Sequence, residues 1–287
     1  MNQNRDYTTI SPSAAALLLL KAQTQLPYAR EAARLLFTLQ ELEDSFDRTH
    51  FGAWASVVHF EHRYATVQQL ILESGLHQLL ELSSGFSFRG QALVQQGHVR
   101  HCIDTDLPDL IEKKAQLCED LHLQFPAGSR LELQALDVMD RAQFLATVDR
   151  FAPGPLAIVT EGLLVYLSRL EREQLCQTIR AVLQARGGCW ITSDIYLQHA
   201  FVQRGTQQAN AWEAFFRQEG VPDQLFTSFE EAEQFFYANG LVVDKVAAPA
   251  YDTLSAVPNL LAVATEPQLQ ALRTGGQIQA TWRLRCR

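Results

Sequence analysis

The stretch Glu81-Leu82-Ser83-Ser84-Gly85-Phe86-Ser87-Phe88-Arg89-Gly90 decides the fold of this chain. It follows a short run, residues 77–80, that is apolar at its end and predicts a buried strand that stops at Glu81. Ser83, Ser84 and Gly85 then predict a tight turn of small residues, at which backbone N–H groups can approach a ligand. This order of strand and turn is the first half of a ligand site.

The residues after the turn supply the second half. Residues 91–96 have helical spacing and end at Gly97, a typical helix stop. Residues 98–103 predict a second strand, and Asp104 and Asp106 follow it. An acid placed about 20 residues beyond such a turn can bind a pair of ribose hydroxyls. The whole order of elements therefore indicates a nucleotide-type site in an open α/β sheet.

The turn lacks the glycines of a dinucleotide site. A pyrophosphate needs close approach of the backbone, and hence two or three glycines, whereas only Gly85 lies in this turn. One glycine and two serines suit a ligand with an adenosine and no phosphates, such as S-adenosylmethionine. An ordinary strand-to-helix turn without a ligand is the alternative that this stretch leaves open.

Further strands downstream indicate a parallel sheet. Residues 130–136 alternate and end at Asp137, and the apolar run 156–160 predicts a central strand that ends at Glu161. Strands and helices alternate with a short period as far as residue 194, which implies right-handed crossovers. Later strand candidates are residues 189–193, 241–246 and an antiparallel last strand at 277–287. We expect a seven-stranded, mostly parallel, doubly wound Rossmann-like sheet.

The first part of the chain has helical periodicity throughout. Apolar residues recur at helical spacing over residues 13–23, 27–46 and 55–74. We interpret residues 1–75 as an N-terminal helical cap on a sheet domain of residues 76–287. Residues 195–226 are rich in glutamine and aromatic side chains. We interpret them as a lid or an insertion after the fifth strand.

Composition excludes several classes of partner. The 287 residues carry a formal net charge of −8, which does not attract nucleic-acid phosphates. The apolar run at residues 14–20 is too short to span a bilayer. Five scattered cysteines without a CxxC motif argue for a reducing compartment, so we expect a cytoplasmic protein. His59 and His62 lie three residues apart but lack a third ligand, so we expect no metal site.

Two motifs together resemble the leucine carboxyl methyltransferase family, which includes bacterial O-methyltransferases associated with polyketide biosynthesis. One is the D-x-DLP segment of residues 104–110 with Lys113, and the other is the EG-x-x-x-YL segment of residues 160–167. Residues 10–14 and 59–64 add to the resemblance, which thins out after Tyr196. The resemblance implies the class I methyltransferase fold, in which N-terminal helices cap the pocket, and S-adenosylmethionine as the cofactor.

The resemblance also implies roles for individual residues at the cofactor. Asp106 would bind the ribose hydroxyls, with Asp104 as its nearest competitor. Arg63 would bind the carboxylate of the methionine part, which a guanidinium fork suits. Asp137 would accept from the adenine amine, and the backbone N–H of Val138 would donate to a ring nitrogen.

Glu161 would lie near the methionine amine. No Lys or Arg follows it in sequence before Arg169, so we expect an acid that is poorly compensated until the cofactor binds. The other expected site residues are Glu81, Ser83 and Gly85 at the cofactor and Tyr166 and Tyr196 at the acceptor.

Purely structural roles stay open for several of these residues. Asp137 could cap the helix over residues 141–148, and Arg63 could pair with Glu61 or Glu73 at the surface. Tyr166 could serve in helix packing, and Lys113 and Lys114 could be solvated charges.

These features predict an enzyme that transfers a methyl group from S-adenosylmethionine to an oxygen. We expect a small-molecule acceptor, a carboxylate first and a hydroxyl second, in preference to a peptide C-terminus. A carboxylate needs no general base, and the sequence nominates none. A nicotinamide-dependent oxidoreductase and a methyltransferase-like binding module without catalysis are the alternatives. The sequence does not indicate an oligomeric state.

Overall fold

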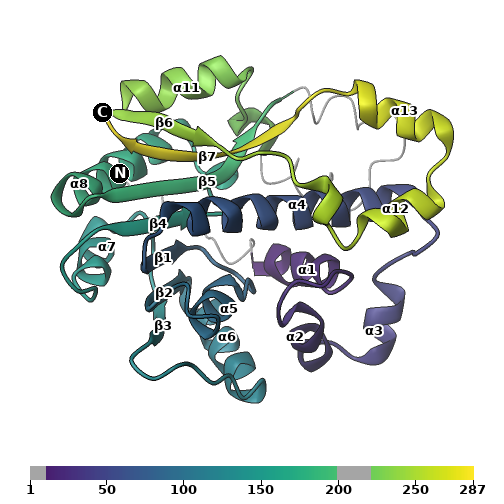
Figure 1. The fold of residues 1–287 in the computed structure, drawn as a ribbon, viewed down its shortest axis with the longest axis horizontal. Helices are drawn as coiled ribbons and strands as arrows, with labels where there is room; N and C mark the ends of the chain where they lie inside the picture. Colours follow the sequence, from purple (N-terminus) through teal and green to yellow (C-terminus); the bar gives the residue numbers. More distant parts are fainter. Residues whose placement is uncertain (1–10, 199–220) are drawn as a thin grey trace.

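The protein is described by a computed structural model over residues 11–198 and 221–287 (Figure 1). Seven strands form one sheet in the order β3-β2-β1-β4-β5-β7-β6. Only β7 runs against its neighbours β5 and β6, so the prediction of a mostly parallel seven-stranded sheet is confirmed. The strands are β1 (Gln78–Leu82), β2 (His101–Asp106), β3 (Arg130–Ala135), β4 (Leu156–Thr160), β5 (Gly188–Tyr196), β6 (Leu241–Val246) and β7 (Gln279–Cys286).

The order of the strands fixes where a ligand can bind. The chain runs outward from β1 to β3 and then returns to β4 on the other side of β1. The crossovers on the two sides of this point diverge, which leaves a crevice at the carboxyl ends of β1 and β4. The turn that follows β1 lies at this crevice, as the sequence predicts.

Two strand ends differ from the sequence prediction. β1 continues through Glu81 to Leu82, and β2 contains both Asp104 and Asp106. Glu81 pairs with Asp104 in the parallel ladder, and Asp106 pairs with Ala135. Backbone pairing therefore extends past the first charged residue of each strand. Buried cations make this tolerable for Glu81 and Asp104, which pair with Arg89 and Lys114, and backbone N–H groups do so for Asp106.

Helices cover both faces of the sheet. α4 (Phe51–Ser74) and α5 (Arg89–Gln95) share one core with Leu79 and Val159 of the strands. α7 (Arg141–Val148), α8 (Arg169–Arg186) and α11 (Phe229–Ala238) share another with Leu80 and Ile158. Adjacent strand residues face opposite cores because the strand period is two. α6 (Pro108–Asp120) packs beside β2 and β3.

The N-terminal helices are more broken than the periodicity predicts. Residues 27–46 form two short helices, α2 (Ala29–Leu36) and α3 (Leu39–Asp44), in place of one. Phe37 adopts an extended conformation between them, and Thr38 caps α3 with a full capping box to Glu41. Capping chemistry therefore overrides the apolar spacing at this point. α1 (Ser11–Lys21) and α2 pack against α6.

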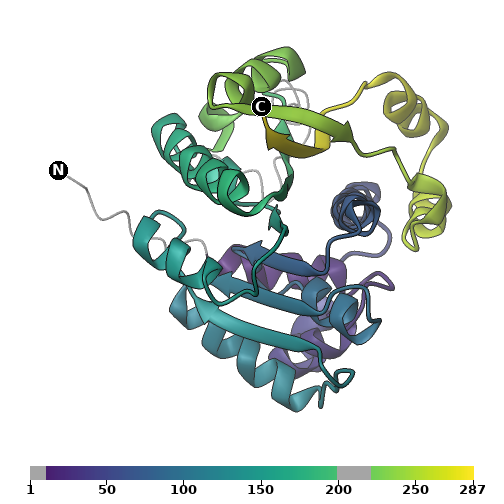
Figure 2. The same ribbon diagram turned by 60° about the vertical axis from the view of Figure 1, so that its left-hand side comes forward.

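Helices from the C-terminal part also cover the crevice. α12 (Val257–Val263) and α13 (Glu266–Thr274) lie at the end of α4 that points away from α7 and α8 (Figures 1 and 2). Leu254 and Leu260 pack with Trp54 of α4 and Leu20 of α1. Glu61 fastens this contact, because its carboxylate accepts hydrogen bonds from the backbone N–H groups of Ser255 and Ala256 at 2.8 and 2.9 Å.

Within the described residues, no helix is both long and apolar enough to cross a membrane.

Candidate functional site

A cavity of about 1360 Å³ lies between the carboxyl ends of the strands and the covering helices. Single-ligand pockets usually measure roughly 300–1,000 Å³, so this cavity has room for a cofactor and a second molecule. Its walls come from α1, α4, the ends of β1, β2, β4 and β5, and the segment of α12 and α13. Of the residues expected at the site, the cavity is lined by Arg63, Glu81, Ser83, Gly85, Asp106, Asp137, Val138, Glu161, Tyr166 and Tyr196.

Asp104 is the expected residue that does not line this cavity. Its side chain is fully buried beneath the turn, where Oδ2 accepts from Lys114 Nζ at 2.7 Å and from Gln91 Nε2 at 2.9 Å. Gly90 makes room for it, since a Cβ at that position would lie 2.6 Å from Asp104 Oδ1. The structure thus separates Asp106, which faces the cavity, from Asp104, which faces the protein interior.

Lys114 is not a solvated charge. It is fully buried and also donates to Ser84 Oγ at 2.9 Å, whereas its neighbour Lys113 is exposed. Burial alone would lower the pKa of Lys114, but the carboxylates of Asp104 and Glu81 outweigh it and raise that pKa. Lys114 is therefore protonated, and its ammonium supports the turn by donating to Ser84.

The turn itself has a strained backbone. Ser83 and Gly85 both adopt positive φ, at 52° and 51°. Serine at positive φ is unfavourable without local support. The support comes from Asp106, whose Oδ2 accepts from the backbone N–H of Gly85 at 2.7 Å, and from Ser84 N–H, which donates to Thr105 O at 2.9 Å.

Asp106 both supports the backbone of this turn and lines the cavity. Its other oxygen, Oδ1, accepts from the backbone N–H of Leu107 at 2.8 Å. Burial raises the pKa of Asp106, while the two backbone N–H groups oppose that shift. Each carboxylate oxygen has a second lone pair, so Asp106 can still accept hydrogen bonds from a ligand.

Glu161 lies among three buried cations, which contradicts the expectation of a poorly compensated acid. Oε1 lies 3.1 Å from Lys21 Nζ and 3.4 Å from Arg63 Nη2, and Oε2 pairs with Arg89. Burial alone would raise the pKa of Glu161, but Lys21, Arg89 and Arg63 together hold it well below its usual range. The partners come from α1, α4 and α5 and are not sequence neighbours.

Arg89 also binds Glu81, so it bridges the ends of β1 and β4. It is fully buried and stacks over the ring of Tyr64 at 4.3 Å. Burial raises the pKa of Glu81 to about 7, although Arg89 opposes this shift. The cluster of Lys21, Arg63, Arg89, Glu81 and Glu161 contains three basic and two acidic side chains, and burial lowers the pKa of Lys21 while its pairing with Glu161 opposes that shift. It therefore favours a ligand that brings a negative charge.

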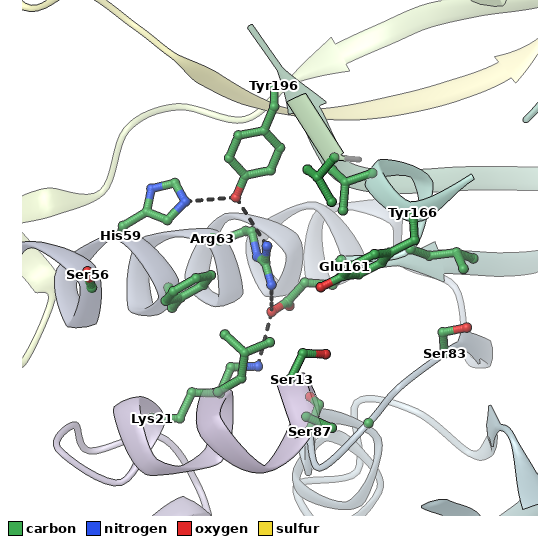
Figure 3. A pocket seen from close by; sticks show the side chains of 18 of the residues that line it. Ser13, Lys21, Ser56, His59, Arg63, Ser83, Ser87, Glu161, Tyr166 and Tyr196 are labelled. Carbon is green, nitrogen blue, oxygen red and sulfur yellow. Dashed lines mark hydrogen bonds and ion pairs between the residues drawn. The ribbon is translucent and has the colours of Figure 1, made fainter. Parts of the chain in front are cut away.

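Arg63 continues the chain of polar contacts toward the other side of the cavity (Figure 3). Its Nη1 donates to Tyr196 Oη at 3.1 Å, and that oxygen also lies 2.8 Å from His59 Nε2. His59 and Arg63 stand four residues apart on α4 and so share one face of the helix. Neither Glu61 nor Glu73 pairs with Arg63, because they bind Ser255 and Lys245.

The adenine-side candidates lie at the end of β3. Asp137 is exposed and Val138 is buried, and both line the cavity. Asp137 accepts from the backbone N–H of Met139 at 2.9 Å and does not cap α7. Asp140 is the cap, with hydrogen bonds from Ala142 and Gln143. Asp137 is therefore available at the mouth of the cavity.

Tyr166 and Tyr196 lie together in the wall of the cavity. They form an apolar cluster with Val165, Val221 and Leu225. The loop after Glu161 is fixed by Asp194, whose carboxylate accepts from three successive backbone N–H groups, those of residues 162–164, at 2.6–3.0 Å. Most of the predicted lid at residues 195–226 lies outside the described residues.

Lys21, Arg89 and Asp194 were not among the residues expected at the site from the sequence. Lys114 was expected only as a solvated charge, and His59 was considered only as a metal ligand. A signal existed for two of them. Arg89 belongs to the stretch that decides the fold, and Lys21 ends the apolar run of a buried helix. In the described part of the chain, no group of three or more His, Cys, Asp or Glu side chains is placed to hold a metal ion.

The strand order, the site at the end of β1 and the acid on β2 define an α/β fold built around a nucleoside-type ligand. The sequence profile of the leucine carboxyl methyltransferase family matches residues 2–180. The chain belongs to this family. It is a methyltransferase with S-adenosylmethionine as its cofactor.

Solved structures share the fold at low identity. A DUF574 family protein from Streptomyces avermitilis is 16% identical, with 96% of this chain and 97% of that chain covered and a TM-score of 0.55. The methyltransferase domain of bacterial CtHen1 is 12% identical, with coverage of 78% and 98% and a TM-score of 0.51. The chain spans about half the length, 53%, of the mitomycin 7-O-methyltransferase MmcR, at 12% identity over 78% of this chain and a TM-score of 0.43. A comparison with curated proteins gives no match.

Proposed function

We propose that this protein is an O-methyltransferase that transfers the methyl group of S-adenosylmethionine to an oxygen of a small molecule. The observation that carries the proposal is the polarity of the cavity. The buried cations at Glu161 form one region of the wall, and Asp106 with the strained turn forms a second. The wall around Tyr166 is apolar, and Tyr196 joins it to Arg63 of the cation cluster. A charged amino-acid part, a ribose and an acceptor suit these regions in turn.

On the basis of this polarity we match each part of the cofactor with the side chains that would bind it. Arg63 and Lys21 face the carboxylate of the methionine part, and Glu161, once partly released by them, faces its ammonium. Asp106 accepts from the ribose hydroxyls. Asp137 and the Val138 N–H bind the adenine edge. The remaining contacts in this assignment come from Glu81 and from the backbone of the turn at Ser83 and Gly85.

The main catalytic task of the protein is to align the acceptor oxygen with the methyl group of the cofactor. The sulfonium carries the activated methyl group, and the acceptor oxygen must approach it in line with the breaking S–C bond. Holding two reactants in such a geometry can contribute roughly 7–11 kcal/mol to lowering the barrier. The apolar walls around Tyr166 and Tyr196 would orient the acceptor and exclude water.

The test has a binding part and a chemical part. Calorimetry should show binding of S-adenosylhomocysteine and no binding of NAD, since the turn lacks the glycines for a pyrophosphate. Incubation with methyl-labelled S-adenosylmethionine and a panel of small aromatic acids and phenols should transfer label to oxygen. Binding without transfer to any acceptor would instead favour a methyltransferase-like module without catalysis. A peptide C-terminus as the labelled product would contradict the small-molecule acceptor.

A further inference from the structure

We infer that the acceptor is an aromatic hydroxyl and that Tyr196 and His59 together remove its proton during methyl transfer. This inference rests on the proposed function and narrows its acceptor. It replaces the carboxylate acceptor that we expected from the sequence with a hydroxyl. The argument starts from the hydrogen bonds of a single oxygen, Tyr196 Oη, in the wall of the cavity.

Tyr196 Oη has a defined set of partners. Arg63 Nη1 lies 3.1 Å away, and a guanidinium can only donate, so Tyr196 accepts this bond. His59 Nε2 lies 2.8 Å away and can accept the tyrosine proton when the imidazole is neutral. A phenol oxygen carries one proton and two lone pairs. Among the described residues these two contacts leave one lone pair of Tyr196 without a partner, at a cavity wall.

This free lone pair of Tyr196 Oη favours an acceptor group that can donate a hydrogen bond, such as a hydroxyl. An acceptor hydroxyl would donate to Tyr196 Oη, Tyr196 would donate to His59 Nε2, and Arg63 would fix the tyrosine oxygen. A phenol suits this arrangement, because its ordinary pKa of about 10 equals that of an ordinary tyrosine. Burial raises the pKa of Tyr196 above that value, although Arg63 opposes this shift, so the tyrosine oxygen can take the acceptor proton as its own proton leaves. An aliphatic alcohol is far less acidic than tyrosine and would not give up its proton along this path.

The charges of the cavity wall disfavour a carboxylate acceptor. The Lys and Arg side chains of the described lining are Lys21, Arg63 and Arg273. Lys21 and Arg63 are already paired with Glu161, and Arg273, with 63% of its side chain exposed, is paired with Glu266. Among the described cations, a carboxylate beside Val165, Tyr166 and Leu225 would have only Arg63 within reach, next to Tyr196, and would compete there with Glu161, which is costly.

The step balances in atoms and charge. The C–O bond forms as the S–CH3 bond breaks, and the sulfonium becomes the neutral thioether of S-adenosylhomocysteine. The acceptor proton moves to Tyr196 Oη, and the tyrosine proton moves to His59 Nε2. The products are an aryl methyl ether, the thioether and an imidazolium, which returns its proton to water after product release. No further reactant is needed.

The first experiment compares matched acceptors. The wild-type protein is incubated with S-adenosylmethionine and either 2-naphthol or 2-naphthoic acid, which differ in the acceptor group and share the ring system. We expect methylation of 2-naphthol and none of 2-naphthoic acid. Transfer to the acid, or to neither compound while S-adenosylhomocysteine still binds, overturns the inference. Failure to bind S-adenosylhomocysteine would overturn the proposed function itself.

The second experiment tests the proton path with His59→Gln. General-base catalysis is worth about 10²–10⁴-fold, so kcat for 2-naphthol should fall by at least about 100-fold. 1-Nitro-2-naphthol, ionised in mildly alkaline buffer, has no proton to lose, and its kcat should fall far less. A merely structural role of His59 would lower both rates equally, and that result overturns the inference.

Two further variants complete this design. Tyr196→Phe should show the same selective loss for 2-naphthol as His59→Gln, because it interrupts the same path. His62→Gln is the matched control, since His62 lies on the same helix, stacks on Tyr251 and does not line the cavity. It should leave both rates unchanged. A loss in His62→Gln equal to that in His59→Gln would show that α4 is merely sensitive to substitution.

Discussion

The ammonium of Lys114 lies 2.7 Å from Oδ2 of Asp104, and both side chains are completely buried beneath the turn at residues 83–85. Lys114 also donates to Ser84 Oγ, so one cation ties α6, β2 and the turn together. This pair faces the protein interior and not the cavity. Its effect on a ligand would therefore be indirect, through the shape of the turn.

Lys114→Met should destabilise the protein by about 3–5 kcal/mol, because it leaves the buried carboxylate of Asp104 without its cation. Urea unfolding at neutral pH measures the change. Lys113→Met is the control, since Lys113 is the exposed neighbour and should change stability by about 0.5 kcal/mol at most. The double variant Lys114→Met/Asp104→Leu should recover part of the loss. If Lys114→Met were as stable as Lys113→Met, the pair would not hold the turn.

The regular parts of the fold follow from local sequence. β4 and β6 have the predicted bounds, because an apolar run between turn residues specifies a strand locally. Positions such as Asp106 and Glu161 were predictable as acids at strand ends, although their protein partners were not. Lys21, Arg63 and Arg89 lie 140, 98 and 72 residues from Glu161 in the chain. No periodicity encodes contacts at such separations.

Two other pairs of residues could not be placed from the sequence, for local physical reasons. Lys113 and Lys114 are adjacent in sequence, and only the angular position on α6 decides which of them is buried. His59 and His62 lie three residues apart on α4, yet His59 faces the cavity and His62 faces Tyr251. To predict which side chain is buried or faces the cavity, one must know how the helix is oriented against the sheet, and tertiary packing sets that orientation.

Glu161→Gln should destabilise the protein without ligand by about 3–5 kcal/mol, since the substitution leaves Lys21, Arg63 and Arg89 with one carboxylate fewer. The native pKa of Glu161 is lowered from the ordinary value of 4.5, so its stabilisation is fully present above pH 4.5. That stabilisation is lost as the pH falls below 4.5. The difference from wild type should therefore shrink in acid.

Urea unfolding of both proteins across this pH range measures the effect. Glu112→Gln, which removes an exposed carboxylate on α6, should leave stability within about 0.5 kcal/mol of wild type. Equal stability of Glu161→Gln and wild type at neutral pH would show that the three cations do not depend on this carboxylate.

Asp106→Asn should weaken binding of S-adenosylhomocysteine by about 1.5–3 kcal/mol, the usual contribution of a charged hydrogen bond. Asp106 also supports the backbone of Gly85, so a general loss of binding would not by itself prove a ribose contact. The decisive comparison uses the analogue that lacks both ribose hydroxyls. Wild type should prefer the natural ligand strongly, and Asp106→Asn should prefer it much less. Asp109→Asn, an exposed change in the first turn of α6, should keep the full preference. A preference that survives in Asp106→Asn would place the ribose elsewhere.

Arg63→Lys should weaken binding of S-adenosylhomocysteine by at least about tenfold, since lysine keeps the charge but loses the fork that fits a carboxylate. 5′-Methylthioadenosine lacks the carboxylate and the amine, so its affinity should not change. Calorimetry with both ligands separates a carboxylate contact from general damage to the cavity. Arg34→Lys, an exposed change on α2 outside the cavity, should bind both ligands as wild type does. Because Arg63 also holds Tyr196 Oη and Glu161, a disturbed cavity would weaken both ligands together. Such a parallel loss would assign Arg63 to the protein's own network and leave the carboxylate to Lys21.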